Sequence, residues 1–178
     1  DNEQTRYQYD LVGNLTAIID AANQKTEFVY DDMGRLDHVI DPLIEAPVDK
    51  RESYIYDEVG NLLTLTDRNG ETTRYTYDEL NRPTLVEYLS DGESDSYYYD
   101  QYGDVVSVEN SQLTYTYTYD EQHRLLSKTD SRENKSLHWT YDNIGNVLTK
   151  TDYQGEITTY TYSGNNRVIS MHNPAYLS

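Results

Sequence analysis

The sequence contains no cysteine, which excludes a disulfide framework and any thiolate metal site. Its 178 residues include four prolines, two methionines, one phenylalanine and one tryptophan. Hydrophobic residues make up 36% of the chain, below the roughly 45–50% of ordinary globular domains. No stretch approaches the ~18 consecutive apolar residues of a membrane-spanning helix. A thick core and membrane insertion are therefore not expected.

Basic residues are also scarce. Lysine and arginine number 14 against 32 aspartates and glutamates, which gives a net charge of −18. Binding to nucleic acid phosphates or to an anionic membrane surface needs basic patches, so both are disfavoured. The charge is typical of a soluble, self-repelling surface, and binding to a cationic partner remains an alternative.

Residue patterns that carry catalysis or bind metals are missing. No pair of carboxylates stands apart from the many acidic residues, and no G-x-S-x-G motif occurs. Histidines show no metal-ligand spacing; they are His38, His123, His138 and His172. Residues 67–71 begin like a calcium loop, but the glutamate at the twelfth loop position is absent and the segment suits a hairpin turn. We expect no enzyme activity, no metal and no cofactor.

What the chain has in abundance is tyrosine, with 20 residues, and most of them belong to an internal repeat. Residues 54–78 open with Tyr-Ile-Tyr-Asp and close with Tyr-Thr-Tyr-Asp, and the rest of the chain repeats this unit. We call the second tyrosine of each such motif the signature tyrosine. The eight signature tyrosines are Tyr9, Tyr30, Tyr56, Tyr77, Tyr99, Tyr119, Tyr141 and Tyr162.

A turn follows each signature tyrosine, and we call it the Y-D turn. Its first residue is an acceptor that can cap the turn: Asp10, Asp31, Asp57, Asp78, Asp100, Asp120, Asp142 and, in the last unit, Ser163. Four residues after the tyrosine comes the turn position, which holds a residue that tolerates positive φ. The turn positions are Gly13, Gly34, Gly60, Asn81, Gly103, His123, Gly145 and Asn166.

A longer period of about 43 residues underlies the short one. The residue after the turn position alternates between Asn or Asp in odd units and Arg in even units: Asn14, Arg35, Asn61, Arg82, Asp104, Arg124, Asn146 and Arg167. The true unit is therefore a pair. We expect these arginines to bind the aspartate of their own turn or to stack on tyrosine rings.

The spacing of turn signals predicts an all-β protein. Strands of about 5–7 residues alternate with turns every 10 or 11 residues, so consecutive strands must be antiparallel neighbours. Eight units predict a meander of about 16 strands in one thin, curved sheet, a single domain over residues 1–178. Four blades of a propeller remain an alternative. We expect loops at residues 41–51, where two prolines forbid a central strand, and at residues 90–95.

Both rings of each Tyr-x-Tyr pair should lie on one sheet face, so stacked units should form rows of tyrosines. Such rows stabilise the sheet or, as the alternative, bind sugar rings. The aromatic candidates for either role are Tyr54, Tyr56, Tyr75, Tyr77, Tyr117, Tyr119, Trp139, Tyr141, Tyr160 and Tyr162. Arg35, Arg82, Arg124 and Arg167 accompany them.

The motif YDxxGN or YDxxGR, repeated over residues 7 to about 170, resembles the YD repeats of the RHS family. This family includes bacterial Rhs polymorphic toxins, the C components of Tc toxin complexes and teneurins. The resemblance implies a sheet that forms part of an RHS-type β-shell, in a fragment of a longer array. It implies a scaffold that encloses or displays a toxin or other effector domain of a secreted or cell-surface bacterial protein.

Two functions thus remain open: a structural shell segment and a carbohydrate-binding module of adhesin type. The expected partners are the remainder of the array, an enclosed effector and, for the alternative, glycans. The two edge strands of the array also predict weak self-association, opposed by the net charge of −18 and favoured by salt.

Overall fold

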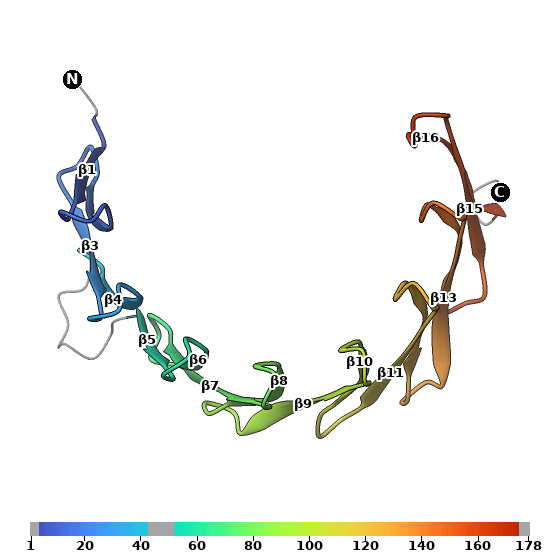
Figure 1. Ribbon diagram of the computed structural model, residues 1–178, viewed down its shortest axis with the longest axis horizontal. Coiled ribbons are helices and arrows are strands. Elements are labelled where there is room, and N and C mark those ends of the chain that lie inside the picture. Colours follow the sequence, from blue (N-terminus) through green and yellow to red (C-terminus); the bar gives the residue numbers. More distant parts are fainter. Residues whose placement is uncertain (1–3, 43–51, 175–178) are drawn as a thin grey trace. The chain divides into compact units, whose positions relative to one another are not determined.

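The computed structural model describes residues 4–42 and 52–174 and shows an all-β protein (Figure 1). Its 16 strands are antiparallel and follow one another in sequence order through a single sheet. This confirms the predicted meander of short strands. A single sheet in sequence order is incompatible with four separate blades, so the propeller alternative is wrong.

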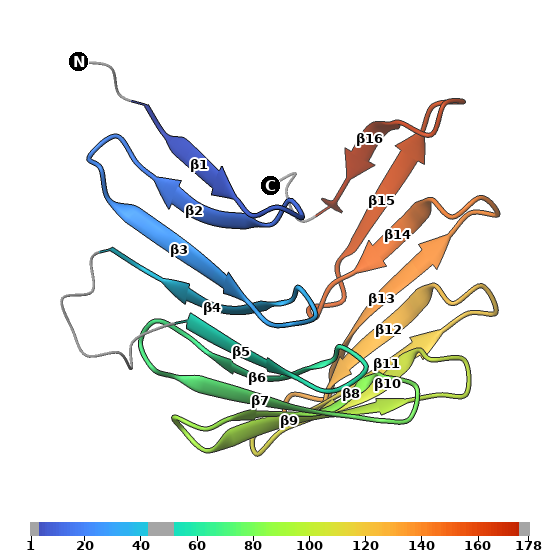
Figure 2. The same ribbon diagram turned by 60° about the vertical axis from the view of Figure 1, so that its left-hand side comes forward.

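The first compact unit covers Asp1–Ser94. Its strands are β1 (Arg6–Tyr9), β2 (Leu15–Ile19), β3 (Lys25–Tyr30), β4 (Leu36–Ile40), β5 (Glu52–Tyr56), β6 (Leu62–Thr66), β7 (Thr72–Tyr77) and β8 (Pro83–Tyr88). The Y-D turns after β1, β3, β5 and β7 lie on one rim of the unit, which we call the Y-D rim (Figure 2). The described connections after β2 and β6 lie on the opposite rim, as the sequence predicted.

The second compact unit covers Asp95–Ser178. Its strands are β9 (Glu93–Tyr99), whose first two residues belong to the first unit, β10 (Val105–Glu109), β11 (Thr114–Tyr119), β12 (Leu125–Asp130), β13 (Lys135–Tyr141), β14 (Val147–Thr151), β15 (Ile157–Tyr162) and β16 (Val168–His172). Every odd strand ends at a signature tyrosine, as in the first unit. The repeat therefore sets the same strand boundaries in both units.

The Y-D turns share one backbone conformation. In the first of them, the Asp10 N–H donates to the Asn14 carbonyl at 2.9 Å and the Gly13 N–H donates to the Asp10 carbonyl at 3.3 Å. All eight turn positions have positive φ, which confirms that prediction. In odd units φ lies between 95° and 100°, and in even units between 57° and 77°. Asn and His tolerate the αL region near 57°, so they replace glycine only in even units.

A β-bulge accompanies each Y-D turn. The register shifts immediately before Tyr9, Tyr30 and Tyr56, and at the equivalent place in the other five units. In the first hairpin Gln8 pairs with Ala17 while Tyr9 pairs with Leu15, so one residue of β2 is extra. A bulge bends the strand and leaves a backbone group without its ladder partner.

The two faces of the sheet differ in chemistry, most clearly in the second unit. Tyr117 lies opposite Lys128 on one face, which we call the aromatic face. On the other face Thr118 and Ser127 are paired, with their hydroxyls 2.6 Å apart. Similar hydroxyl pairs join Thr140 to Thr149 and Thr161 to Ser170. Neither face is wholly apolar, as the sequence predicted.

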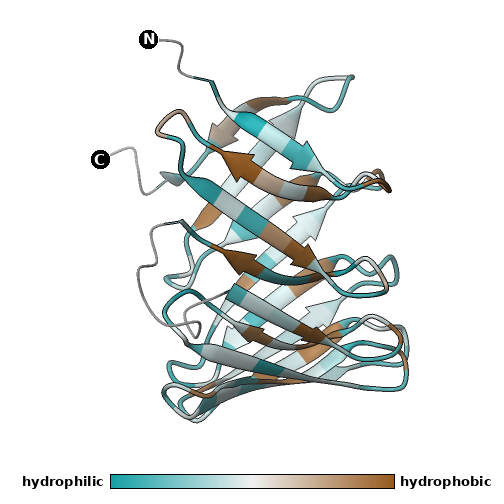
Figure 3. Cartoon of the chain, turned by 90° about the vertical axis from the view of Figure 1, so that its left-hand side faces the viewer, coloured by the Kyte–Doolittle hydropathy of each residue, from teal (hydrophilic) through white to brown (hydrophobic). Residues whose placement is uncertain are grey.

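Burial is shallow for a chain of this size. Among the described residues only Ala17, Val39 and Val86 are buried hydrophobic side chains, and all three lie in the first unit. Figure 3 shows hydrophobic segments interrupted by paler and hydrophilic ones along the strands of that unit. Most strand side chains are half-buried. Hydrogen bonding within the sheet therefore has a large share in holding each unit together.

The predicted loops are only partly settled. The expectation of a loop over residues 90–95 is wrong at its end, because β9 already begins at Glu93. Gly92, with φ of 75°, donates its N–H to the Tyr88 carbonyl at 2.9 Å and completes the turn early. Most of the predicted loop at 41–51 lies outside the described residues. Within the described part of the chain, no helix is long and apolar enough to cross a membrane.

Candidate functional site

In the first seven Y-D turns an aspartate opens the turn and holds it closed. Oδ1 of Asp78 accepts from the backbone N–H groups of Leu80 and Arg82, at 2.9 and 3.0 Å, and Oδ2 accepts from Arg82 Nε at 2.8 Å. The hydrogen bonds from Arg82 lower the pKa of the Asp78 carboxyl below its usual range. These aspartates are ionised turn caps with several donors each, which is unlike a poised general acid.

The arginines of two even repeats, Arg35 and Arg124, extend this network to the following hairpin. Arg124 Nε lies 2.6 Å from the Asp120 carboxylate, and Nη1 donates to the Asp142 carbonyl at 2.8 Å. Its guanidinium also lies over the Tyr141 ring, 4.8 Å from the centroid. Arg35 makes the same three contacts. The structure places Arg35 and Arg124 in both roles that the sequence suggested. Arg82 pairs with the aspartate of its own turn, Asp78. For Arg167 the hydrogen bond among the described residues is that of its backbone N–H to Ser163 Oγ.

Odd units continue the network with a shorter side chain. Asn61 Nδ2 donates to the Asp57 carboxylate and to Asn81 Oδ1, each at 2.8 Å. Asn146 makes the equivalent bonds in the seventh unit, where the distance to Asn166 is 3.4 Å. At Arg35, Asn61, Arg124 and Asn146 the alternation of Asn and Arg in the sequence is thus an alternation of two kinds of link along the Y-D rim.

The signature tyrosines connect neighbouring hairpins from the strand side. The hydroxyl of Tyr141 donates at 2.8 Å to the carbonyl of Leu125, the first residue of β12. Tyr30, Tyr77, Tyr119 and Tyr162 donate to the first residue of β2, β6, β10 and β14, at 2.8 to 2.9 Å. Each accepting residue takes part in the bulge of the preceding hairpin. The hydroxyl therefore binds a backbone group beside the irregular part of the ladder.

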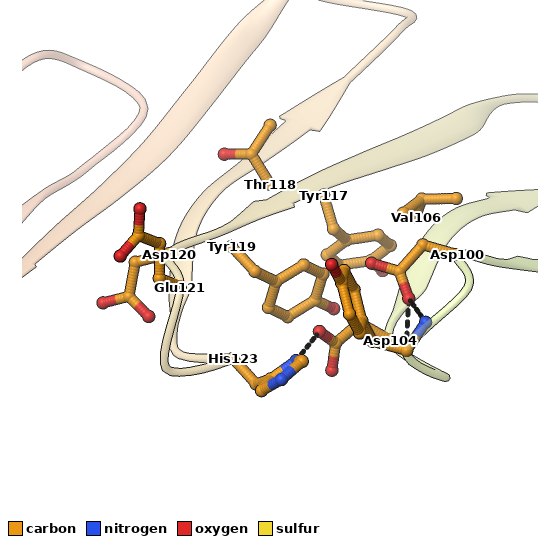
Figure 4. A pocket seen from close by; sticks show the side chains of 10 residues that line it. Asp100, Asp104, Val106, Tyr117, Thr118, Tyr119, Asp120, Glu121 and His123 are labelled. Carbon is orange, nitrogen blue, oxygen red and sulfur yellow. Dashed lines mark hydrogen bonds and ion pairs between the residues drawn. The ribbon is translucent and has the colours of Figure 1, made fainter.

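A cavity of about 400 Å³ lies between the Y-D turns of the fifth and sixth units (Figure 4). Its aromatic lining is Tyr102, Tyr117 and Tyr119, and its polar lining includes Asp104 and His123. In Figure 4 the imidazole of His123 and the carboxylate of Asp104 point toward one another. Aromatic faces beside carboxylates suit sugar hydroxyls or a cation, so this is the cavity to weigh as a binding site.

Internal contacts already engage most of these polar groups. His123 Nδ1 lies 2.6 Å from Asp104 Oδ2, and this hydrogen bond raises the pKa of the imidazole. Oδ1 of Asp100 accepts from the N–H groups of Tyr102, Gly103 and Asp104. The ring of Tyr102, 71% exposed, packs edge-on against His123, with centroids 5.3 Å apart. These contacts organise the turn pair by themselves.

An equivalent cavity of about 440 Å³ lies between the Y-D turns of the first and second sequence repeats, within the first compact unit. It has the same position in the repeat, but Val12, Asn14 and Gly34 stand where the other has Tyr102, Asp104 and His123. The space therefore recurs at two junctions where an odd turn precedes an even one, while its chemistry varies. No group of three or more His, Cys, Asp or Glu side chains suits a metal ion within the described ranges.

Basic side chains cover several of the aromatic rings. Lys128 Nζ lies 3.7 Å from the centroid of Tyr115 and 5.8 Å from that of Tyr117. Lys150 Nζ lies 6.0 Å from the Trp139 ring. No role for these lysines was predicted from the sequence, although Lys128 and Lys150 hold equivalent places in β12 and β14. Strand alternation could have predicted these contacts, because it places Lys128 and Lys150 on the same sheet face as the aromatic rings of the neighbouring strands.

The predicted rows of tyrosines are not continuous. Tyr75 lies opposite Val86, Tyr54 opposite Leu65 and Tyr160 opposite Met171, so an aliphatic or basic residue separates successive rings. In the first compact unit the hydroxyl of Tyr54 donates to Glu52. Burial, together with this hydrogen bond, raises the pKa of Tyr54 to about 12. The candidate aromatic residues are thus spread over the sheet rather than gathered at one site.

Comparisons with known proteins agree with this architecture. A family model described as RHS Repeat matches residues 9–43, 56–94 and 138–176. The crystal structure of TcdB2-TccC3-Cdc42 is similar over 92% of this chain, with 23% identity and a TM-score of 0.74. That of TcdB2-TccC3 without its hypervariable C-terminal region is similar over 93%, again with 23% identity and a TM-score of 0.74. No curated protein matches the sequence.

The chain corresponds to only 10% of the length of each of these two solved chains. At this level of identity the similarity shows the fold. It supports the all-β repeat architecture and does not transfer the activity of the larger proteins.

Proposed function

Because the chain belongs to the RHS repeat family, we propose that this structural repeat module is a non-catalytic segment of a longer array that encloses or displays an effector domain. The observation that carries the proposal is the network along the Y-D rim. Arg35 and Arg124 each join their own turn to the following hairpin, and the signature tyrosines do the same from the strand side. The arginines and tyrosines that define the repeat motif thus bind one hairpin to the next, which is the role expected of a structural repeat.

Shallow burial supports the same function. A repeat array that buries three hydrophobic side chains among its described residues resembles a wall more than a self-contained globule. We propose that residues 1–178 form one continuous repeat domain of that wall. The larger protein is proposed to be bacterial and secreted or displayed at the cell surface. With a net charge of −18, the wall suits a cationic effector.

The larger similar proteins give this proposal its context. One of them, TcdB2-TccC3, was crystallised without a hypervariable C-terminal region. We propose an analogous arrangement, in which a domain encoded beyond these repeats is the effector. The remainder of the array then supplies the rest of the enclosure.

Protease protection in the full-length protein tests this function. The effector domain is expected to resist digestion while the array is intact. It should become sensitive in a Gly60→Val variant, because a β-branched residue at φ of 100° opens the wall. The isolated effector domain, digested in parallel, shows its own sensitivity. Equal cleavage in the intact protein and in isolation would contradict enclosure.

Carbohydrate binding is the weaker alternative. Arg35, Arg124, Lys128 and Lys150 lie over the rings of Tyr56, Tyr141, Tyr115 and Trp139, where a sugar would stack. A glycan panel compares the wild type with a double variant, Tyr75→Ala and Tyr77→Ala. Binding by the wild type that the variant loses would favour the alternative, whereas no binding removes its support.

A further inference from the structure

The fifth Y-D turn differs from the six other turns that an aspartate opens. In those six, Oδ2 of the aspartate accepts a hydrogen bond from the side chain that follows the turn position: Asn14, Arg35, Asn61, Arg82, Arg124 and Asn146. The fifth turn has Asp104 at this place, and a carboxylate is an acceptor only. Oδ2 of Asp100 therefore has no side-chain donor within the described part of the chain.

This carboxylate belongs to the lining of the cavity between the fifth and sixth Y-D turns, as does that of Asp104. In Figure 4 the dashed hydrogen bonds of Asp100 meet one of its carboxylate oxygens, while the other oxygen has none. Asp104 binds His123 through Oδ2, which leaves its Oδ1. Two carboxylates of one cavity thus each keep an oxygen that can accept a hydrogen bond from a ligand.

The lining favours a ligand that is a cation. It includes a single histidine and four carboxylates, those of Asp100, Asp104, Asp120 and Glu121. The ring of Tyr102, also in the lining, is 71% exposed, so a cation can lie over an open ring face. A neutral sugar would gain less from this excess of negative charge.

The chain itself shows which cation suits a Y-D turn. At the sixth turn, Arg124 Nε lies 2.6 Å from Asp120 Oδ2 while the guanidinium lies over the ring of Tyr141. Arg35 binds the second turn in the same way. A planar guanidinium directs several donors at carboxylates and stacks on a ring at the same time, whereas an ammonium group offers only a point charge.

We propose that the cavity between the fifth and sixth Y-D turns binds the guanidinium group of an arginine side chain from a partner polypeptide. The guanidinium donates to Oδ2 of Asp100 and Oδ1 of Asp104, and it lies against the ring of Tyr102. It supplies from outside the hydrogen bond that Asn or Arg supplies from within the other turns. The site does not depend on whether the array encloses an effector.

The equivalent cavity between the first and second Y-D turns serves as an internal comparison. Its volume is similar, about 440 Å³ against about 400 Å³. There Asn14 Nδ2 already donates to Asp10 Oδ2 at 2.9 Å, and Val12 stands in the place of Tyr102. The space is thus shared by both cavities, while the unused carboxylate oxygen and the open tyrosine ring distinguish the one between the fifth and sixth turns.

Titration with blocked amino acids tests the ligand. N-acetyl-arginine amide is added to the 178-residue chain while the backbone amides are followed by NMR. We expect saturable shifts at residues 100–104 and 120–123 and none at residues 10–14. N-acetyl-citrulline amide has the same shape with an uncharged urea group, and it should bind roughly tenfold more weakly. Equal binding of the two probes, or shifts spread over the whole chain, would overturn the proposal.

N-acetyl-lysine amide separates the guanidinium from a positive charge alone. It carries the same charge as the arginine probe without the planar fork, so we expect its affinity to be several-fold lower. Equal affinity for the lysine and arginine probes would refute the assignment of a guanidinium.

Asp104→Asn tests the missing donor. Asn14, Asn61 and Asn146 occupy this place in the other odd turns, so the variant should fold and keep the wild-type circular dichroism spectrum. Its new amide can donate to Asp100 Oδ2, and binding of the arginine probe should weaken by roughly tenfold or more. Gln101→Ala, an exposed change in the same turn, is the matched control and should bind as the wild type does. Unchanged binding by Asp104→Asn would refute the site.

Asn14→Asp provides the converse experiment. It removes the side-chain donor of Asp10 Oδ2 and so gives the first cavity the unused oxygen that the fifth turn has. The arginine probe should then shift the amides of residues 10–14 as well, though with lower affinity, because Val12 offers no ring. A folded variant without these new shifts would show that the missing donor does not select a guanidinium.

Discussion

His123 Nδ1 lies 2.6 Å from Asp104 Oδ2, at the place in the repeat where other units join two amides. Asn61 meets Asn81, and Asn146 meets Asn166, through the same pair of positions. The fifth and sixth units thus replace an uncharged link by an ionisable one. His123 adopts φ of 60°, close to the 59° of Asn81, so the exchange leaves the backbone unchanged.

The first prediction concerns the pH dependence of stability. The hydrogen bond that the His123 ring donates to the Asp104 carboxylate, reinforced by the charges of Asp104, Asp100 and Asp120, raises the pKa of His123 above 6.5, although burial acts in the opposite sense. A raised folded pKa stabilises the protein fully below the unfolded value. This contribution is lost as the pH rises through the folded pKa. Urea unfolding should therefore give a lower midpoint above that pKa than at pH about 6.

His123→Asn is the matched control for this prediction, because Asn occupies the equivalent position in two other even units. It should remove the dependence on pH near neutrality. A titration of the His123 ring by NMR in the Asp104→Asn variant is expected to show a lower pKa. An identical pKa in that variant would disprove the assigned cause.

The second prediction separates odd from even turn positions. Gly13 has φ of 100° and Gly34 has φ of 77°, and neither would place a Cβ within 4 Å of a neighbour. Gly13→Asn should destabilise by about 1–2 kcal/mol, since only glycine suits its backbone. Gly34→Asn should lie within about 0.5 kcal/mol of the wild type. Thermal unfolding of both variants measures the difference, and equal losses would refute it.

The third prediction concerns the tyrosine hydroxyl. Tyr141→Phe removes the donor to the Leu125 carbonyl and should cost about 1 kcal/mol of unfolding free energy. Tyr102→Phe, at a ring that is 71% exposed, is the control and should change stability by less than about 0.5 kcal/mol. Equilibrium unfolding in urea compares the two. Equal stability of both variants would show that the hydroxyl bond adds nothing.

The fourth prediction concerns the arginine link. Arg124→Ala should cost about 1–2 kcal/mol, because the side chain loses a carboxylate, a carbonyl and a ring contact together. Arg124→Lys retains the charge without the planar fork and is expected to recover less than half of that loss. Urea unfolding measures both, with Arg132→Ala as a surface control. Full recovery by lysine would show that charge alone matters.

The strands and turns could be predicted because their causes are local. Asp10 caps the turn that it opens, and Gly13 supplies the positive φ that the turn requires. The alternation of Asn14 and Arg35 was visible in the sequence as well. Antiparallel order then followed from the short connections.

The partners of the alternating residues could not be predicted in full. Arg35 reaches the Asp57 carbonyl 22 residues away, because β4 pairs with β5 of the next hairpin, and a simple strand pattern does not reveal that proximity. Lys128 lies over Tyr115 because the register of β11 and β12 brings the two strands together. The early start of β9 likewise depended on Gly92, within a segment that reads as uniformly polar.

The forward direction of the links between hairpins has a consequence for biosynthesis. Leu125 receives its hydroxyl from Tyr141, and Arg124 finds its carbonyl at Asp142, so the sixth hairpin is complete only after the seventh has been translated. The hydroxyl bonds of Tyr30, Tyr77, Tyr119 and Tyr162 run in the same direction, so the hairpins that accept them are also completed by their successors as the chain leaves the ribosome. Each arriving hairpin both finishes the one before it and offers the next attachment point, so the sheet grows from the N-terminus in the order of translation.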